Sequence, residues 1–147
     1  MVMDELAVAV FDNKVTKASR SEKYSKHWLR HPGGKGKVAV DTKTGIVLGF
    51  GVLRSTNQDF CSLAPLYATS DNVAAGLIQE LCANFSQKQS GIRLEFLTTN
   101  SELMEKLVES LGAVTGRRIS RVMFQQQEIP FQHAMVYCIA DGACNYI

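Results

Sequence analysis

The chain has 147 residues, of which 46% are hydrophobic and 20% are charged, and we expect one soluble globular domain spanning residues 1–147. Sixteen basic and fourteen acidic side chains leave a formal charge of only +2, which argues against a nucleic acid or an acidic membrane as partner. No basic segment precedes an apolar core at the N-terminus, and no apolar run approaches the ~20 residues that span a bilayer. We therefore expect a cytoplasmic or nucleocytoplasmic protein.

The first 70 residues predict a short strand, a helix and then an antiparallel meander. Ser19 followed by Glu22 is a capping-box pattern, so a helix is expected from Ser19 to about Arg30, where a Pro-Gly-Gly sequence follows. Polar turns separate the next runs of β-branched and aromatic residues, which indicates hairpins. The expected strands are Ala7–Val10, Lys37–Val40, Ile46–Leu53 and Phe60–Tyr67.

The second half alternates helices with strands. Ser70 or Asp71 can cap one helix, and Asn100 or Ser101 can cap another. The elements expected here are a helix over Asn72–Phe85, a strand over Ile92–Leu97, a helix from residue 101 to 111, and strands over Arg118–Phe124 and Ala134–Ala140. The β-α-β segment predicts one parallel strand pair with a right-handed crossover.

Together these elements predict an α/β (α+β) fold. Its sheet should be mixed, largely antiparallel and twisted, with about six or seven strands and flanking helices. The apolar positions of the strands and helices indicate a core that includes Trp28, Phe50, Val52, Leu66, Leu77, Leu81, Phe96, Leu107 and Leu111.

The four cysteines do not indicate a metal site or a disulfide framework. They form no C-x-x-C pair, and no histidine lies at ligand spacing from them. We expect reduced and mostly buried thiols, and no bound metal.

Two neighbouring strand sequences carry a more specific pattern: residues 49–54 read GFGVLR, and residues 63–68 read LAPLYA. Phe11-Asp12 followed by Arg20 and Trp28, and the sequence RVMF over residues 121–124, add to the pattern. In order and spacing, these segments resemble the C-terminal domain of the YitH-like branch of the GNAT acetyltransferases, across nearly the whole chain. The predicted order of elements is also typical of the GNAT superfamily.

The resemblance implies that acetyl-CoA is the cosubstrate and that a small amine or amino-acid-like molecule is the acceptor. Its pantetheine arm would pair with the strand at Leu63, Ala64, Pro65 and Leu66, beside the strand that ends at Leu97. Its phosphates would approach Thr69, Ser70, Asn72 and Val73 at a helix N-terminus. Asn100 and Ser101 stand where the family begins its next core helix.

Two departures from the family pattern leave the chemistry open. The usual glycine-rich phosphate loop is replaced by residues 68–76, ATSDNVAAG, in which Asp71 places negative charge and Ser70 or Asp71 can simply cap the helix. The usual tyrosine acid is replaced by Val108. Glu95, Tyr67 and Tyr137 are the remaining candidates for proton transfer. Each could equally be structural, as an ion-paired carboxylate or a buried ring with a bonded hydroxyl.

The sequence therefore leaves two functions open. One is an N-acetyltransferase that uses acetyl-CoA. The other is a non-catalytic GNAT-like domain for ligand binding or scaffolding, which could be one half of a two-domain acetyltransferase. A homodimer is also possible, because the last predicted hairpin leaves sheet edges that need cover.

Overall fold

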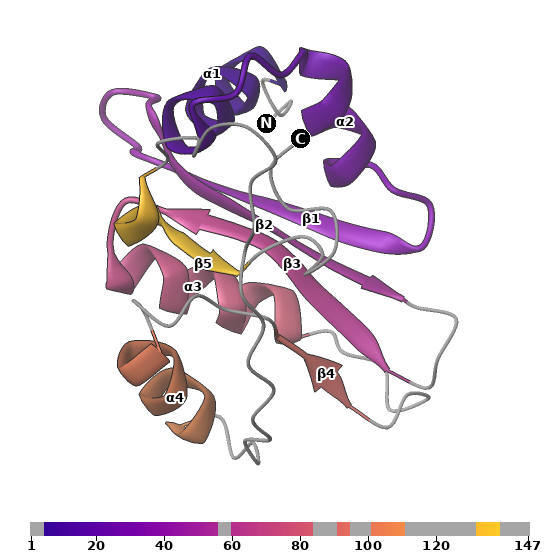
Figure 1. Ribbon diagram of the computed structural model, residues 1–147, viewed down its shortest axis with the longest axis vertical. Helices are drawn as coiled ribbons and strands as arrows, with labels where there is room; N and C mark the ends of the chain where they lie inside the picture. Colours follow the sequence, from indigo (N-terminus) through magenta and orange to yellow (C-terminus); the bar gives the residue numbers. More distant parts are fainter. Residues whose placement is uncertain (1–4, 56–59, 84–90, 95–100, 111–131, 139–147) are drawn as a thin grey trace, which may run out of the picture.

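The structure is a computed structural model that describes residues 5–55, 60–83, 91–94, 101–110 and 132–138. Figure 1 shows a twisted sheet with helices α1 and α2 on one face and helices α3 and α4 on the other. The elements are α1 (Glu5–Thr16), α2 (Glu22–Leu29), β1 (Gly34–Val40), β2 (Val47–Ser55), β3 (Cys61–Ala68), α3 (Asp71–Cys82), β4 (Ile92–Arg93), α4 (Ser101–Ser110), a 3₁₀ turn (His133–Met135) and β5 (Val136–Cys138). None of the helices in these ranges is long and apolar enough to cross a membrane.

Five strands form one mixed sheet in the described part of the chain. β1, β2 and β3 form an antiparallel meander, in which Phe50 lies opposite Tyr67. β4 pairs with β3 in parallel, with Cys61 opposite Ile92. The predicted mixed, largely antiparallel sheet with one parallel pair is confirmed. A sheet of about six or seven strands stays a prediction, because the expected strand Arg118–Phe124 lies outside the described residues.

The strand predicted over Ala7–Val10 is wrong, because these residues lie inside α1. Val8, Phe11 and Val15 recur at helical spacing and are buried against the sheet, whereas Val10 is 63% exposed. A run of four alanine and valine residues is too short to show a helical or a strand periodicity in hydrophobicity. Burial of one face of the longer helix therefore decides the structure. The start of α2 also differs from the prediction, since Ser21 rather than Ser19 is its N-cap.

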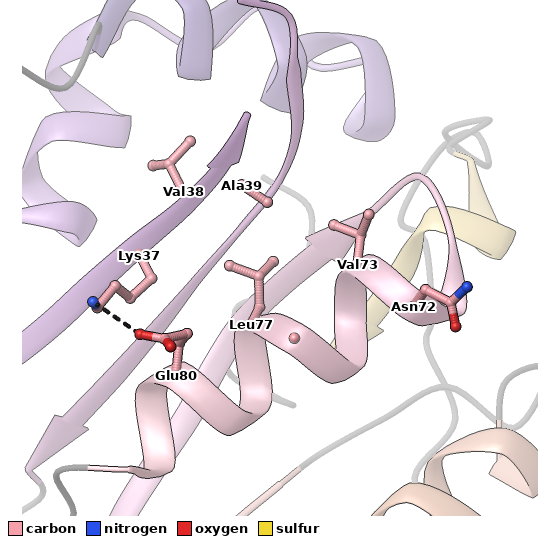
Figure 2. A pocket seen from close by; sticks show the side chains of 8 residues that line it. Lys37, Val38, Ala39, Asn72, Val73, Leu77 and Glu80 are labelled. Atoms are coloured by element: carbon pink, nitrogen blue, oxygen red, sulfur yellow. Dashed lines mark hydrogen bonds and ion pairs between the residues drawn. The ribbon is translucent and has the colours of Figure 1, made fainter. Parts of the chain in front are cut away.

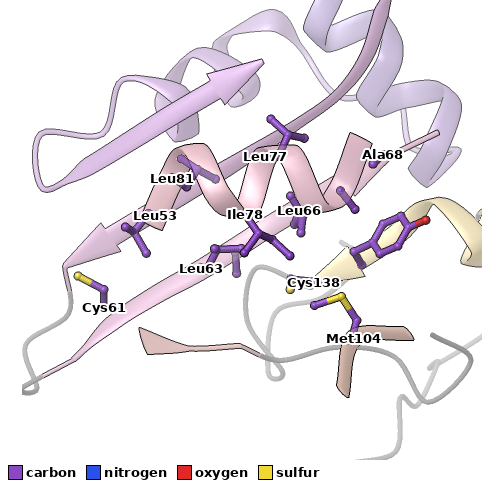
Figure 3. Close-up of a cluster of buried hydrophobic side chains, with 13 residues drawn as sticks. Leu53, Cys61, Leu63, Leu66, Ala68, Leu77, Ile78, Leu81, Met104 and Cys138 are labelled. Carbon is purple, nitrogen blue, oxygen red and sulfur yellow. The ribbon is translucent and has the colours of Figure 1, made fainter. Parts of the chain in front are cut away.

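The core has one cluster on each face of the sheet. Figure 3 shows the cluster on the α3 face, where Leu63 and Leu66 of β3 pack with Ile78 and Leu81 of α3, and Met104 of α4 covers them. The cluster on the other face joins β2 and β3 to α1 and α2. Five predicted core residues are confirmed as buried: Phe50, Val52, Leu66, Leu77 and Leu81.

Four other core predictions have different outcomes. Trp28 is only partly buried, at the margin of the cluster beside α1 and α2. Phe96 and Leu111 lie outside the described residues. Leu107 belongs to α4, but the burial of its side chain lies outside what the structure describes.

Gly49 marks a tight approach between β2 and β3. A Cβ atom there would lie 2.6 Å from the carbonyl oxygen of Tyr67 and 3.0 Å from the Cα of Ala68. Because these are backbone atoms, Gly49→Ala should lower the free energy of unfolding by about 1–3 kcal/mol in urea denaturation. The matched control is Gly76→Ala in α3, where nothing lies within 4 Å of the new Cβ. It should raise stability by about 0.5–1 kcal/mol. Equal effects of the two changes would contradict this account.

Candidate functional site

Strand β3 is irregular in its middle. Its register with β2 shifts between Gly51 and Leu53, so that Ala64 and Pro65 together face the single residue Val52. Such a bulge bends the strand and interrupts the ladder of backbone hydrogen bonds. Pro65 itself offers no backbone N–H. The interruption lies within the segment that the sequence analysis proposed for the pantetheine arm.

Two short strands share the outer edge of β3. β4 pairs with Cys61 and Ser62 in parallel, and β5 pairs with Leu66 and Tyr67 in the antiparallel sense. Within the described residues, the pairing of β3 with these two strands leaves out the segment 63–65, where the bulge lies. A pantetheine arm bound along β3 beyond the bulge would therefore meet β5, a contact that the sequence did not predict.

Tyr137 links β5 to the N-terminus of α3. Its hydroxyl donates a hydrogen bond of 2.6 Å to Oδ1 of Asp71. Burial raises the pKa of the Tyr137 phenol, and the hydrogen bond to Asp71 acts in the same direction. Ser70 caps the same helix, since its side chain accepts a hydrogen bond from the backbone N–H of Val73. The side chains of Ser70 and Asp71 thus already have partners within the chain.

A buried polar cluster lies on the opposite face of the sheet, where Tyr67 of β3 meets Asp12 of α1 and Arg20. Asp12 is fully buried, and its Oδ1 lies 3.4 Å from Nη1 of Arg20. The Arg20 guanidinium also lies near the hydroxyl of Tyr67, and it lies 4.5 Å from the ring centroid of Tyr24. One arginine therefore joins the first helix to the central strand.

Asn13 fixes the backbone of Arg20 through two hydrogen bonds. Its Oδ1 accepts from the Arg20 N–H at 2.7 Å, and its Nδ2 donates to the Arg20 carbonyl at 3.0 Å. The turn between α1 and α2 is thereby held in the shape that aims the guanidinium at Asp12.

The buried charges of this cluster are only partly compensated by their partners. Burial raises the pKa of Asp12, and the charge of Arg20 offsets part of that effect. Among the described residues, Oδ2 of Asp12 and Nε of Arg20 are buried without a hydrogen-bond partner. Burial also raises the pKa of Tyr67 well above its usual range. Because a guanidinium only donates hydrogen bonds, the Tyr67 hydroxyl keeps its own proton for another acceptor.

The predicted site residues fall into separate groups in the structure. Leu63, Ala64, Pro65 and Leu66 are buried in β3, whereas Thr69 and Ser70 are exposed just before α3. Asn72 and Val73 lie in the first turn of α3, and α4 begins at Ser101. Glu95 and Asn100 lie outside the described residues.

Tyr67 and Tyr137 were both predicted as candidates for proton transfer, whereas the buried ion pair was not predicted as part of a site. Tyr67 and Tyr137 contribute to clusters on opposite faces of the sheet, so they cannot act on one group together. Sequence reasoning noticed Asp12 and Arg20 only as parts of a resemblance. The signal for a buried pair was a carboxylate within the apolar stripe of a helix, which the prediction of a strand ending at Val10 concealed.

A mixed sheet with this helix arrangement and a bulged central strand defines the acetyltransferase-like class of α/β domains. Residues 8–138 match the family model described as the acetyltransferase (GNAT) domain. The chain therefore belongs to the GNAT acetyltransferase family, as the sequence resemblance predicted. Assignment to the YitH-like branch stays a prediction.

Solved structures share the fold at low sequence identity. One described as a probable acetyltransferase has a TM-score of 0.60 and 17% identity, covering 84% of this chain and 93% of that one. The ribosomal-protein-alanine N-acetyltransferase of Brucella melitensis has a TM-score of 0.59 and 18% identity, covering 82% and 94%. The glucosamine-6-phosphate N-acetyltransferase of Arabidopsis thaliana has a TM-score of 0.55 and 10% identity, covering 82% and 88%. The sequence has no significant match among curated proteins.

Arg20→Met tests the buried ion pair. The change leaves a buried Asp12 carboxylate without its counter-ion, so we expect a loss of about 3 kcal/mol of stability at pH 7. The folded-state pKa of Asp12, already raised, should rise further above its unfolded value. The folded variant then binds the proton more tightly than the unfolded chain, so the deficit should shrink as the pH falls toward ~4. Urea denaturation from pH 7 to pH 4 measures this.

Asp12→Asn combined with Arg20→Met is the control. It removes the buried charge, and its stability should not improve on acidification relative to the unaltered protein. A deficit of Arg20→Met that is the same at every pH would show that the arginine acts through packing alone.

Proposed function

We propose that this domain is an acetyl-CoA-dependent N-acetyltransferase whose acceptor is a small amine or amino-acid-like molecule. The observation that carries the proposal is the bulge of β3 at Ala64 and Pro65 in a chain of the GNAT family, directly before the buried Tyr67. The names of two structural neighbours refer to a ribosomal-protein alanine and to glucosamine-6-phosphate. A shared fold is therefore compatible with different acceptors, and the small acceptor rests on the sequence resemblance.

The reaction needs three contributions from the protein. The acceptor nitrogen attacks the thioester carbonyl and loses a proton, negative charge develops on the carbonyl oxygen, and the coenzyme thiolate leaves and gains a proton. Backbone N–H groups of β3 next to the bulge are the proposed donors to the developing oxyanion. Pro65 cannot contribute to this set, because it has no N–H.

Tyr67 is the proposed acid for the leaving thiolate. It lies two residues beyond Pro65, and its phenol carries a proton at physiological pH that it can donate. The positive charge of the nearby Arg20 guanidinium would stabilise the phenolate that forms when the proton is transferred. In this mechanism Arg20 and Asp12 are positioning residues. A role for Glu95 as the base stays a prediction.

The second candidate, a non-catalytic GNAT-like domain, is supported by a different observation. β5 pairs with β3 beyond the bulge, and the hydroxyl of Tyr137 is bonded to Asp71. A coenzyme bound along this edge would have to exchange those backbone contacts and approach the charge of Asp71. A domain that never binds the coenzyme would keep both interactions permanently.

Titration with acetyl-CoA by calorimetry separates the two candidates. If the phosphates approach the N-terminus of α3, Asp71→Asn removes an opposing charge, so it should tighten binding about fivefold and make it less dependent on salt. Tyr137→Phe removes the hydrogen bond to Asp71 but keeps the charge of that carboxylate, so it should give a smaller gain. A larger gain from Tyr137→Phe than from Asp71→Asn would mean that the hydrogen bond, and not the charge, limits binding. No heat from any of the three proteins at millimolar acetyl-CoA would favour the non-catalytic domain.

Tyr67→Phe tests the proposed acid. Release of coenzyme thiol should be measured with a panel of amino acids, amino sugars and a peptide with N-terminal alanine. With any acceptor that reacts, kcat should fall about a hundredfold while acetyl-CoA binding is unchanged, since the proton donor acts only in the transition state. A variant with full activity would exclude this role for Tyr67, and the unfolding midpoint of the variant controls for loss of structure.

A further inference from the structure

A groove of about 340 Å³ lies between β1 and α3, away from the buried polar cluster and the bulge of β3. Figure 2 shows Ala39 of β1 on one side and Val73 and Leu77 of α3 on the other, with an ion pair between Lys37 and Glu80 at one end. Only its far end, at Asn72 and Val73, touches the turn predicted for phosphate. Its apolar lining does not suit an anionic ligand.

In the described part of the chain, the groove opens beside a strand that has one unpaired edge. Within the described residues β1 lies at the end of the sheet, with β2 as its one partner. Its register with β2 is regular from Gly34 to Ala39 and shifts only at Val40. A regular edge strand presents a row of backbone N–H and C=O groups that can pair with another strand.

Side chains of β1 alternate between the two faces of the sheet. Ala39 packs against the α3 cluster and Lys37 reaches Glu80 of α3, whereas Val38 packs with the cluster on the other face. A strand added beside β1 would lie about 4.8 Å away, with every second side chain on the α3 face. Those side chains would enter the groove.

Gly76 provides room for such a side chain. It lies in the interior of α3 and lines the groove, and a Cβ built on it meets nothing within 4 Å. A glycine inside a helix costs about 1 kcal/mol relative to alanine. No close contact among the described residues requires glycine at this place. The open space beside Gly76 is therefore part of the groove.

Charge favours a partner other than a second copy of this chain. Lys35 and Lys37 lie two residues apart on β1, so both face α3, and Glu80 pairs with Lys37. Two β1 strands paired side by side in the antiparallel sense would bring lysines of both copies together, and opposed like charges destabilise a sheet. An acidic side chain on the incoming strand would instead complement Lys35.

We propose that β1 and the groove bind an extended segment of a partner protein by strand addition. The segment carries an apolar side chain over Gly76 and an acidic side chain beside Lys35. Because both face α3, they are separated by an even number of positions in the segment. Backbone pairing along β1 supplies affinity, and the groove and the lysine supply selectivity.

The test uses a labelled seven-residue peptide, which matches the length of β1. The peptide Thr-Glu-Thr-Val-Thr-Leu-Thr puts its acidic and apolar side chains on one face. The control Thr-Glu-Val-Thr-Leu-Thr-Thr has the same composition but puts its glutamate on the face opposite to valine and leucine. Fluorescence anisotropy on the full chain should show binding of the first and not of the second. Equal binding of the two, or binding of neither at millimolar protein, would overturn the proposal.

Two substitutions examine the groove and the charge separately. Gly76→Leu fills the groove and should weaken the alternating peptide about tenfold, the effect of excluding one apolar side chain, while Gly76→Ala leaves most of the room. Lys35→Glu should weaken this peptide and strengthen an analogue with lysine in place of glutamate. Thermal unfolding confirms that each variant is folded.

Unchanged binding by both Gly76→Leu and Lys35→Glu would refute the assigned surface. Sedimentation tests the alternative occupant of the groove, a second copy of this chain. A dimer that Gly76→Leu dissociates would show that a second copy, and not a partner protein, fills the groove.

Discussion

Burial of β3 between two hydrophobic clusters is the constraint on which the other elements depend. Leu63 and Leu66 pack under α3, while Tyr67 packs under the first two helices. Because both faces are covered, the strand has only its edges for contact with anything outside the core. β2 occupies one edge along its length, and β4 and β5 divide the other. The bulge at Ala64 and Pro65 therefore lies where backbone groups are least accessible to water and where an incoming donor or acceptor would matter most.

The Asp12–Arg20 pair shows how the helical layer is tied to this strand. A buried ion pair is rarely a net source of stability, because removal of two charges from water offsets most of their attraction. In this protein the ion pair instead constrains how α1 is positioned against β3. The guanidinium must reach Asp12 and Tyr67 at once, and Asn13 holds its backbone in place. An apolar contact would not fix α1 at one position along β3 in this way.

The sequence was sufficient for the elements whose pattern is local. α3 was predicted because its apolar residues recur at helical spacing and Ser70 caps it, and the β1–β2–β3 meander because polar turns separate its runs. α1 was missed because alternating alanine and valine fits either structure until a partner face is known. Tyr137 and Asp71 are separated by 66 positions, so no local sequence pattern predicts their hydrogen bond. The residues expected to bind the coenzyme were assigned from the family resemblance. The pairing of β5 beside them could be seen only in the three-dimensional structure.

The division of the outer edge of β3 also has a consequence for the order of folding. The meander joins neighbouring segments through short turns, so it can form early during synthesis. β5, which covers Leu66 and Tyr67, comes from much later in the chain. Until that segment leaves the ribosome, the end of β3 is an open apolar strand that can pair with other nascent chains. A delay in the arrival of β5 would thus leave this edge of β3 open to aggregation.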